Sequence, residues 1–326
     1  MEMRVINAAA VRRLLPMAEC IRLMRRAFEV VATGEAIQPI RHALQHPAGR
    51  GLLGWMPGYV SNPEWLGIKV VAVFAPDAAG LLGSHQGMVL LFDATNGRPV
   101  AVIDAGEVTA IRTAAATAVA TDVLAPLSAV SLGVLGTGEQ AGRHVEALTQ
   151  IRPFKSVLIW GRDGTHARTL AAQLASHCPA AIVTVDTARE AASCDVVCTT
   201  TAARDPILFG EWLRPGQHLN VVGSSIPSTS EVDEAAVARG RLFVDFRDSA
   251  LALAGDIRRA KAAGLIDDDH IIGCIGEVLL GRIRGRLSAA DITIFKSLGM
   301  ASEDLIACDY VLTESRRRGI GQSVDW

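Results

Sequence analysis

The sequence predicts an α/β protein in which a doubly wound parallel sheet is joined to a smaller antiparallel sheet. Beyond residue 130, short apolar runs alternate with helix-compatible segments, as parallel strands alternate with their crossover helices. Between Ile37 and Asp104, β-forming runs are separated only by turns, so neighbouring strands there should pair antiparallel. A chain of 326 residues is long enough for two domains, each with its own core.

In chain order, the first predicted element is a helix from about Pro16 to Thr33, because its apolar residues recur at steps of three and four. After the antiparallel strands, an alanine-rich helix is predicted from about Glu107 to Leu124, since alanine has the best helix propensity. This helix is expected to bridge the two domains. The predicted antiparallel strands are 52–56, 68–74, 88–92 and 100–104.

Further along the chain, one helix is predicted from Arg247 to Gly264 and a last helix from Ser302 to Arg317. Six strands precede these helices, and each is short and apolar, as strands buried on both faces are. The predicted parallel strands are 130–135, 156–160, 181–185, 195–199, 219–223 and 242–245.

A glycine turn, GTGEQA (136–141), follows the first parallel strand directly. Gly136 permits a tight turn, Gly138 lets the backbone approach a pyrophosphate, and the small Ala141 lets helix and strand pack closely. The pyrophosphate would bind the free N–H groups at the positive end of the helix dipole. The turn alone has a purely structural interpretation, but the strand 156–160 follows at the expected distance. We therefore predict a Rossmann-type dinucleotide site.

The residues after the second parallel strand indicate which dinucleotide binds. NAD sites usually carry an acidic residue there, which bonds the ribose 2′-hydroxyl. Here Gly161 is followed by Arg162, which can bind a 2′-phosphate through charge-assisted hydrogen bonds, and then by Asp163. A shift of one residue would place the carboxylate at the ribose instead. We predict NADP(H) as the preferred cofactor, with NAD(H) as the second.

Composition excludes several classes of protein. Half of the residues are hydrophobic, a fifth are charged and the net charge is −2, so neither nucleic acid nor a membrane surface is an expected partner. No apolar run approaches the length of a membrane span, and no signal peptide is predicted. The six cysteines form no CxxC pair, so we expect free thiols in a reducing cytoplasm and no metal site.

Three basic residues could carry chemistry, and each also has a structural interpretation. Lys69 shares a strand face with Gly67 and Val71, so it is either buried with a partner or a charge that protects an edge strand. Arg112 could bind a carboxylate through two hydrogen bonds, or it could be an ordinary surface arginine. Arg41 is a loop arginine that the pattern does not distinguish.

Five stretches resemble the ornithine cyclodeaminase/mu-crystallin family, and they follow the family's order along nearly the whole chain. This resemblance implies a homodimer formed through the N-terminal antiparallel sheet, and chemistry on amino acids through an imine and a nicotinamide. It also implies a dimerisation and substrate-binding domain of residues 1–115 and 300–326, and a Rossmann domain of residues 116–299. The stretches are GLLGWMPGY (51–59), SHQGMVLLFDATNG (84–97), RTAAATAVAT (112–121), GTGEQA (136–141) and TIFKSLGMASEDLIA (293–307).

The resemblance also assigns residues to the site. Arg41 and Arg112 match arginines that bind the substrate carboxylate, and Lys69 matches a lysine that lies over the reacting carbon. Met56 is expected to contact the substrate, and Lys69, Arg112 and Ser225 form the predicted catalytic set. The predicted cofactor-binding residues are Ser84, His85, Thr113, Gly136, Thr137, Gly138, Glu139, Gln140, Gly161, Arg162, Asp163, Thr200 and Val222.

One departure from the family pattern decides between reactions. The resemblance implies that cyclodeaminases carry the pattern G-A-D-x-P-G-K-x-E, in which the aspartate acts on the substrate amine. At the matching positions this chain reads GSSIPSTSE (223–231). Ser225 replaces the aspartate, as in ketimine reductases of the mu-crystallin type, and Thr229 replaces the lysine. Without that carboxylate there is no obvious base for an incoming amine, while a preformed imine needs only a proton and a hydride.

We therefore predict NAD(P)H-dependent reduction of a small cyclic or linear α-imino acid to the L-amino acid, of the pyrroline-2-carboxylate or piperideine-2-carboxylate type. Two alternatives stay open. The first is an ornithine cyclodeaminase or an amino-acid oxidoreductase of the alanine dehydrogenase type. The second is a protein that binds a nucleotide and a small carboxylate without turnover.

Overall fold

The computed structural model describes residues 2–74 and 85–325. Contacts between backbone segments divide the chain into two compact units. The first unit combines Met1–Arg112 with Met300–Trp326, and the second contains Thr113–Gly299. The division falls within helix α3 (Ala105–Leu124).

The first unit is built on a sheet with the strand order β16-β1-β7-β6-β5-β4-β2, in which β3 also pairs with β4. From β4 to β7 all neighbours pair antiparallel, which confirms the prediction for this region. β1 and β16 were not predicted, because they are short and lie at opposite ends of the chain. The strands are β1 (Glu2–Ile6), β2 (Ala36–Ile37), β3 (His42–Gln45), β4 (Gly51–Ser61), β5 (Glu64–Phe74), β6 (His85–Asp93), β7 (Pro99–Asp104) and β16 (Gln322–Asp325).

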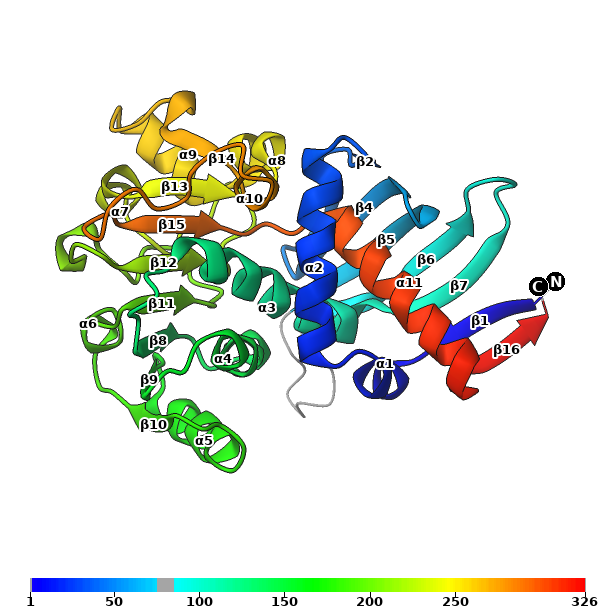
Figure 1. Ribbon diagram of the computed structural model, residues 1–326, viewed down its shortest axis with the longest axis horizontal. Coiled ribbons are helices and arrows are strands. Elements are labelled where there is room, and N and C mark those ends of the chain that lie inside the picture. The colour runs from blue at the N-terminus through cyan, green and yellow to red at the C-terminus, as the bar shows by residue number, and fades with distance from the viewer. Residues whose placement is uncertain (1, 75–84, 326) are drawn as a thin grey trace. The chain divides into compact units, whose positions relative to one another are not determined.

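Helices cover one face of this sheet. α11 (Ala301–Arg318) lies across β4, β5 and β6, and α2 (Met17–Ala32) packs on α11 (Figure 1). The close approach of α11 requires glycine beneath it, since a Cβ at Gly67 of β5 would lie 2.3 Å from a methyl carbon of Leu305. Gly319, at φ 65°, ends α11 in the left-handed conformation that glycine favours. The short helix α1 (Ala8–Leu14) precedes α2.

The second unit is a parallel sheet with the strand order β10-β9-β8-β11-β12-β15-β13-β14. This confirms the predicted doubly wound architecture. β14 and β15 were not predicted: each has four residues, and β15 contains the polar Thr293 and Lys296. The strands are β8 (Ser131–Leu135), β9 (Ser156–Trp160), β10 (Ala181–Thr184), β11 (Val196–Thr199), β12 (His218–Val221), β13 (Arg241–Val244), β14 (Ile271–Cys274) and β15 (Thr293–Lys296).

The prediction of one helix from Arg247 to Gly264 is wrong, because the segment forms two helices that meet at Ala254. Ala254 has an extended backbone, with φ −73° and ψ 107°. Gly255 follows, and a Cβ there would lie 1.8 Å from the carbonyl oxygen of Thr229, so the chain needs glycine at this approach. The α-helices wholly within this unit are α4 (Glu139–Ile151), α5 (Gly164–Ala175), α6 (Ala188–Ala191), α7 (Glu234–Arg239), α8 (Arg247–Leu253), α9 (Gly255–Ala262) and α10 (Ile275–Leu279).

Within the described parts of the chain, no helix has the length and apolar character needed to cross a bilayer.

The packing of α11 on β5 yields a stability prediction. Gly67→Ala should destabilise the protein by about 1–3 kcal/mol, because the added methyl overlaps Leu305 and the carbonyl of Leu90. Gly54→Ala on the neighbouring strand is the control, since its Cβ meets atoms no closer than 3.7 Å. Urea unfolding followed by circular dichroism measures both. Equal midpoints for the two variants would contradict this account of the α11 contact.

Candidate functional site

Lys69 lies on an interior strand of the first unit. β5 is paired on both sides, with Met56 of β4 opposite Lys69 on one side and Val89 of β6 on the other. Its exposed fraction is 4%. The edge-strand interpretation is therefore wrong, and the buried one is confirmed. A buried lysine needs a partner or a function.

Two carboxylates of α11 pair with Lys69 and Arg112, two of the three predicted basic residues. The Nζ atom of Lys69 lies 2.7 Å from Oδ2 of Asp304. Arg112 reaches the other oxygen of Asp304 through Nε at 3.0 Å, and its Nη1 lies 2.8 Å from Oε2 of Glu303. All four side chains are at most 5% exposed. We call these four residues the Lys69 cluster: two cations and two carboxylates, contributed by β5, α3 and α11.

The helix start explains why the carboxylates are placed there. Glu303 and Asp304 lie in the first turn of α11, where the helix dipole stabilises negative charge. Neither residue was assigned a role from the sequence. A signal was present, because two acids open the otherwise apolar run that continues with Leu305, Ile306 and Ala307, and buried acids are rare unless they are paired.

The cluster changes the acidity of Lys69. Burial lowers the pKa of its ammonium to about 8, and the positive charge of Arg112 acts in the same direction. Asp304 opposes both effects, because its carboxylate stabilises the charged form. A group with this pKa exchanges protons near neutral pH, as a general acid must.

The other predicted substrate residues belong to the same unit. Met56 is 8% exposed and lies next to Lys69 across the β4–β5 pair. Arg41 is half-buried in the segment between β2 and β3. The structure therefore brings Met56, Lys69 and Arg112 together. Arg41 directly precedes β3, which pairs with β4.

The glycine turn of the second unit lies where three parallel strands end. The backbone N–H of Thr200, after β11, donates to the carbonyl of Leu135, the last residue of β8. Gly136 has φ 138°, and a Cβ there would lie 2.5 Å from Oγ1 of Thr200. Gly161, after β9, comes equally close to Thr137, since its Cβ would lie 2.4 Å from Cγ2 of that residue.

The start of α4 fits a bound pyrophosphate. Gly138 is the N-cap residue and has no side chain, so it cannot accept hydrogen bonds from the first turn, which begins with Glu139 and Gln140. A Cβ at Gly138 would meet nothing within 4 Å, so space remains over the turn. Glycines that are tight at Gly136 and open at Gly138 are what a dinucleotide requires of this turn.

The remaining predicted cofactor residues, and Ser225 of the predicted catalytic set, lie at the following places. Asp163 is the N-cap of α5, and the hydrogen bond from the backbone N–H of Thr165 lowers its pKa. Arg162 beside it is exposed. Thr113 and Val222 are buried in the second unit, and Ser225 is half-buried in the segment after β12. His85 begins β6 of the first unit, and Ser84 lies outside the described residues.

A glycine turn at the carboxyl edge of a parallel sheet, together with a buried lysine–arginine–carboxylate cluster, is typical of an enzyme that uses a dinucleotide. A model of the ornithine cyclodeaminase/mu-crystallin family matches residues 1–318. The chain belongs to this family.

Three relatives show how far the similarity extends. The ketimine reductase mu-crystallin of Mus musculus is 38% identical over 279 residues, which is 85% of either chain. The structure of Thermococcus litoralis Δ1-pyrroline-2-carboxylate reductase in complex with NADH and L-proline has a TM-score of 0.96 and 32% identity, and covers 99% of this chain and 100% of its own. An archaeal alanine dehydrogenase dimer with bound NAD has a TM-score of 0.94 and 28% identity, over all of both chains.

Breaking a buried ion pair of the Lys69 cluster should cost more stability than breaking an exposed one. Asp304→Asn should cost about 3–5 kcal/mol of stability, because Lys69 and Arg112 both lose a buried partner. Glu19→Gln is the control, since its ion pair with Arg22 is as short, at 2.5 Å, but solvent-exposed, and should cost at most about 1 kcal/mol. Urea unfolding compares them, and similar costs would contradict the role of burial.

Proposed function

We propose that the protein reduces small cyclic or linear α-imino acids to L-amino acids with NAD(P)H. The observation that carries this proposal is the Lys69 cluster: a buried ammonium with a pKa of about 8, paired within the same unit to the carboxylate of Asp304. The similarity to a ketimine reductase and to a pyrroline-2-carboxylate reductase supports the same reaction class.

Binding begins with the substrate carboxylate, which Arg41 and Arg112 hold. Glu303 and Asp304 fix the guanidinium plane of Arg112 through Nη1 and Nε, so its orientation is set before substrate arrives. Preorganisation of this kind reduces the entropy lost on binding. Met56 packs beside Lys69 and contributes apolar surface for the carbon chain of the substrate.

Lys69 supplies the proton. Its Nζ donates to the imine nitrogen, which turns the imine into an iminium and makes the carbon electrophilic. A nicotinamide cofactor, whose pyrophosphate the glycine turn would hold, would supply the hydride that this carbon accepts. Asp304 then stabilises the Lys69 side chain as it regains its proton from solvent. The product is the amino acid with a tetrahedral α-carbon.

Ser225 separates reduction from deamination. A cyclodeaminase needs a base for the substrate amine, and a serine hydroxyl is too weak an acceptor of protons for that role at neutral pH. A preformed imine carries no such proton. An amino-acid dehydrogenase is the second candidate, because the alanine dehydrogenase dimer has nearly the same fold.

For the cofactor, we propose a preference for NADP(H). The carboxylate of Asp163 accepts a hydrogen bond from the backbone N–H of Thr165 at the start of α5. Arg162 beside it is exposed, and its guanidinium is the group that would bind a 2′-phosphate. The two solved relatives hold NADH and NAD. The preference therefore rests on Arg162 of this chain.

The first unit also has a face suited to a second copy of the chain. Opposite α11, the sheet exposes apolar residues of four adjacent strands, and an exposed apolar surface of this extent is typical of an interface. We propose a homodimer formed through this face, as the resemblance implies. The exposed apolar residues of this face include Leu44, Leu53, Leu66 and Met88.

All six cysteines are free thiols, which supports a reducing cytoplasm as the location.

A panel of substrates tests the function. Δ1-Pyrroline-2-carboxylate, Δ1-piperideine-2-carboxylate and a linear imine of pyruvate are assayed for oxidation of NADPH, and ornithine and alanine are assayed with NADP⁺ and NAD⁺. We expect saturable reduction of at least one imine and poor conversion of ornithine. Ammonia release from ornithine or alanine at a rate rivalling imine reduction contradicts the proposal. Saturable binding without any turnover favours a binding protein.

Loss of the proton donor should be visible in kcat. Lys69→Met keeps most of the buried volume, and we expect kcat for imine reduction to fall about 10²–10⁴-fold, the usual contribution of a general acid. The Kd of the cofactor, measured by fluorescence, should barely change, because the glycine turn belongs to the second unit. Circular dichroism checks the fold. A folded variant with nearly wild-type kcat would reduce Lys69 to a structural residue.

The cofactor preference depends on one side chain. Wild-type enzyme should show a higher kcat/KM with NADPH than with NADH, and Arg162→Ala should lower only the NADPH value, by about tenfold, since a charge-assisted hydrogen bond is lost. Arg258→Ala, another arginine of the second unit, is the control. Equal kcat/KM for both cofactors, unaffected by Arg162→Ala, would overturn the preference.

A further inference from the structure

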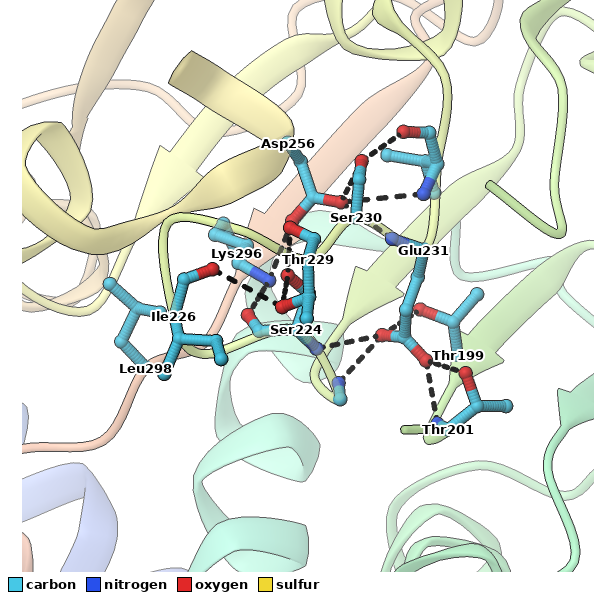
Figure 2. Close-up of polar contacts among 12 residues, drawn as sticks. Thr199, Thr201, Ser224, Ile226, Thr229, Ser230, Glu231, Asp256, Lys296 and Leu298 are labelled. Carbon is cyan, nitrogen blue, oxygen red and sulfur yellow. Dashed lines mark hydrogen bonds and ion pairs between the residues drawn. The ribbon is translucent and has the colours of Figure 1, made fainter. Parts of the chain in front are cut away.

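The segment from Val222 to Glu231 follows β12 and carries Ser225, and buried charges hold it (Figure 2). Lys296 lies in the stretch TIFKSLGMASEDLIA (293–307) and Glu231 ends the stretch GSSIPSTSE (223–231), yet neither has a role in the reaction described above. Their side chains are at most 1% exposed. Charges this deeply buried are costly unless they make specific contacts.

Glu231 joins the ends of two neighbouring strands. Its Oε1 accepts hydrogen bonds from the backbone N–H of Thr201 at 2.6 Å and from the hydroxyl of the same residue at 2.7 Å. Its Oε2 accepts from the hydroxyl of Thr199 at 2.8 Å and from the backbone N–H of Gly223 at 2.6 Å. The backbone N–H of Ser224 also points to Oε2, at 3.3 Å. One carboxylate therefore holds the residues that follow β11 and β12.

Lys296 approaches the same segment from the end of β15. Its Nζ donates to the carbonyl oxygen of Ser224 at 2.5 Å and pairs with Oδ2 of Asp256 at 2.9 Å. The other oxygen of Asp256 accepts from the hydroxyl of Ser230 and the backbone N–H of Glu231, both at 2.8 Å. Asp256 thus ties the lysine to the far end of the segment, from the first turn of α9.

Ser224 is held at both of its backbone groups, by Glu231 at the N–H and by Lys296 at the carbonyl. Its hydroxyl donates to the carbonyl of Thr229 at 2.6 Å. The Ser224 carbonyl belongs to the peptide that joins it to Ser225. The ammonium of Lys296 therefore fixes the plane of the peptide that joins Ser224 to Ser225. The position of the Ser225 Cα, from which the side chain projects, is fixed with it.

We propose that Lys296 is a positioning residue of the reductase, which sets the location of Ser225 through the carbonyl of Ser224. This inference rests on the proposed function, because Ser225 matters to it as a member of the predicted catalytic set. The structural alternative is that Lys296 only neutralises Asp256. A buried ion pair can be replaced by uncharged residues with little loss of stability. If Lys296 only neutralises Asp256, replacing both residues should therefore leave kcat unchanged. If Lys296 positions Ser225, the same double replacement should lower kcat.

Four variants separate positioning from charge balance. Lys296→Met removes both contacts, Asp256→Asn removes the ion pair but leaves the ammonium near Ser224, and the double variant removes both charges. Lys261→Met is the matched control, since its ion pair with Asp268 lies at the surface. Rates are divided by the concentration of cofactor-binding sites, measured by fluorescence, so that unfolded protein does not contribute.

We expect kcat for imine reduction to fall roughly 10²-fold in Lys296→Met and in the double variant, because displacements of about 1 Å cost this much. Asp256→Asn and Lys261→Met should stay within about threefold of wild type, and the cofactor Kd should stay within the same range in all four. If Asp256→Asn loses as much kcat as Lys296→Met, or if the double variant regains wild-type kcat, the proposal is overturned.

A second measurement needs no substrate. Hydrogen–deuterium exchange in peptides covering residues 224–230 should accelerate roughly tenfold in Lys296→Met and not in Lys261→Met, because the hydrogen bond from a charged group to Ser224 is lost. Unchanged exchange overturns the proposal. If wild-type enzyme reduces no imine, the proposed function fails, while the exchange result still decides whether Lys296 holds this segment.

Discussion

The first unit depends on the buried ion pair between Lys69 and Asp304. It joins a central strand to the first turn of α11, and Asp304 also pairs with Arg112 of α3. With Glu303 the two cations and two carboxylates balance, so each charged group is tolerated although it is buried. The same pairing opposes the loss of the Lys69 proton that burial favours, and so holds its pKa near the range in which enzymes exchange protons.

The second unit uses buried charge for a related purpose. Glu231 accepts hydrogen bonds from residues that follow β11 and β12, and Lys296 reaches the same segment from β15. These contacts order backbone at the carboxyl edge of the sheet, where ligands of doubly wound folds bind. In both units a buried charged side chain contacts a residue that the proposed mechanism uses or its backbone, so that mechanism depends on residues outside the reacting set.

Features with a local signal could be predicted from the sequence. The glycine turn, the alternating strands and the antiparallel runs each depend on a few neighbouring residues, and the structure contains them. The acids that open the apolar run of α11 carry a local signal, but the pairing of Asp304 with Lys69 does not, because the two residues lie far apart in the chain. The break at Ala254 was missed for the same reason: it follows from the contact of Gly255 with Thr229. The resemblance indicated which basic residues matter, but not which carboxylates hold them.

The pH dependence of kcat for imine reduction tests the central claim most directly. If Lys69 donates the proton, kcat at saturating imine and cofactor falls as pH rises through about 8, because the neutral amine cannot donate. In Asp304→Asn no carboxylate of residue 304 stabilises the ammonium of Lys69, so the midpoint of the kcat profile moves to lower pH. Titration of the substrate affects wild type and variant alike, so it cancels in the comparison. A flat wild-type profile across this range, or a midpoint that Asp304→Asn leaves in place, would contradict the account.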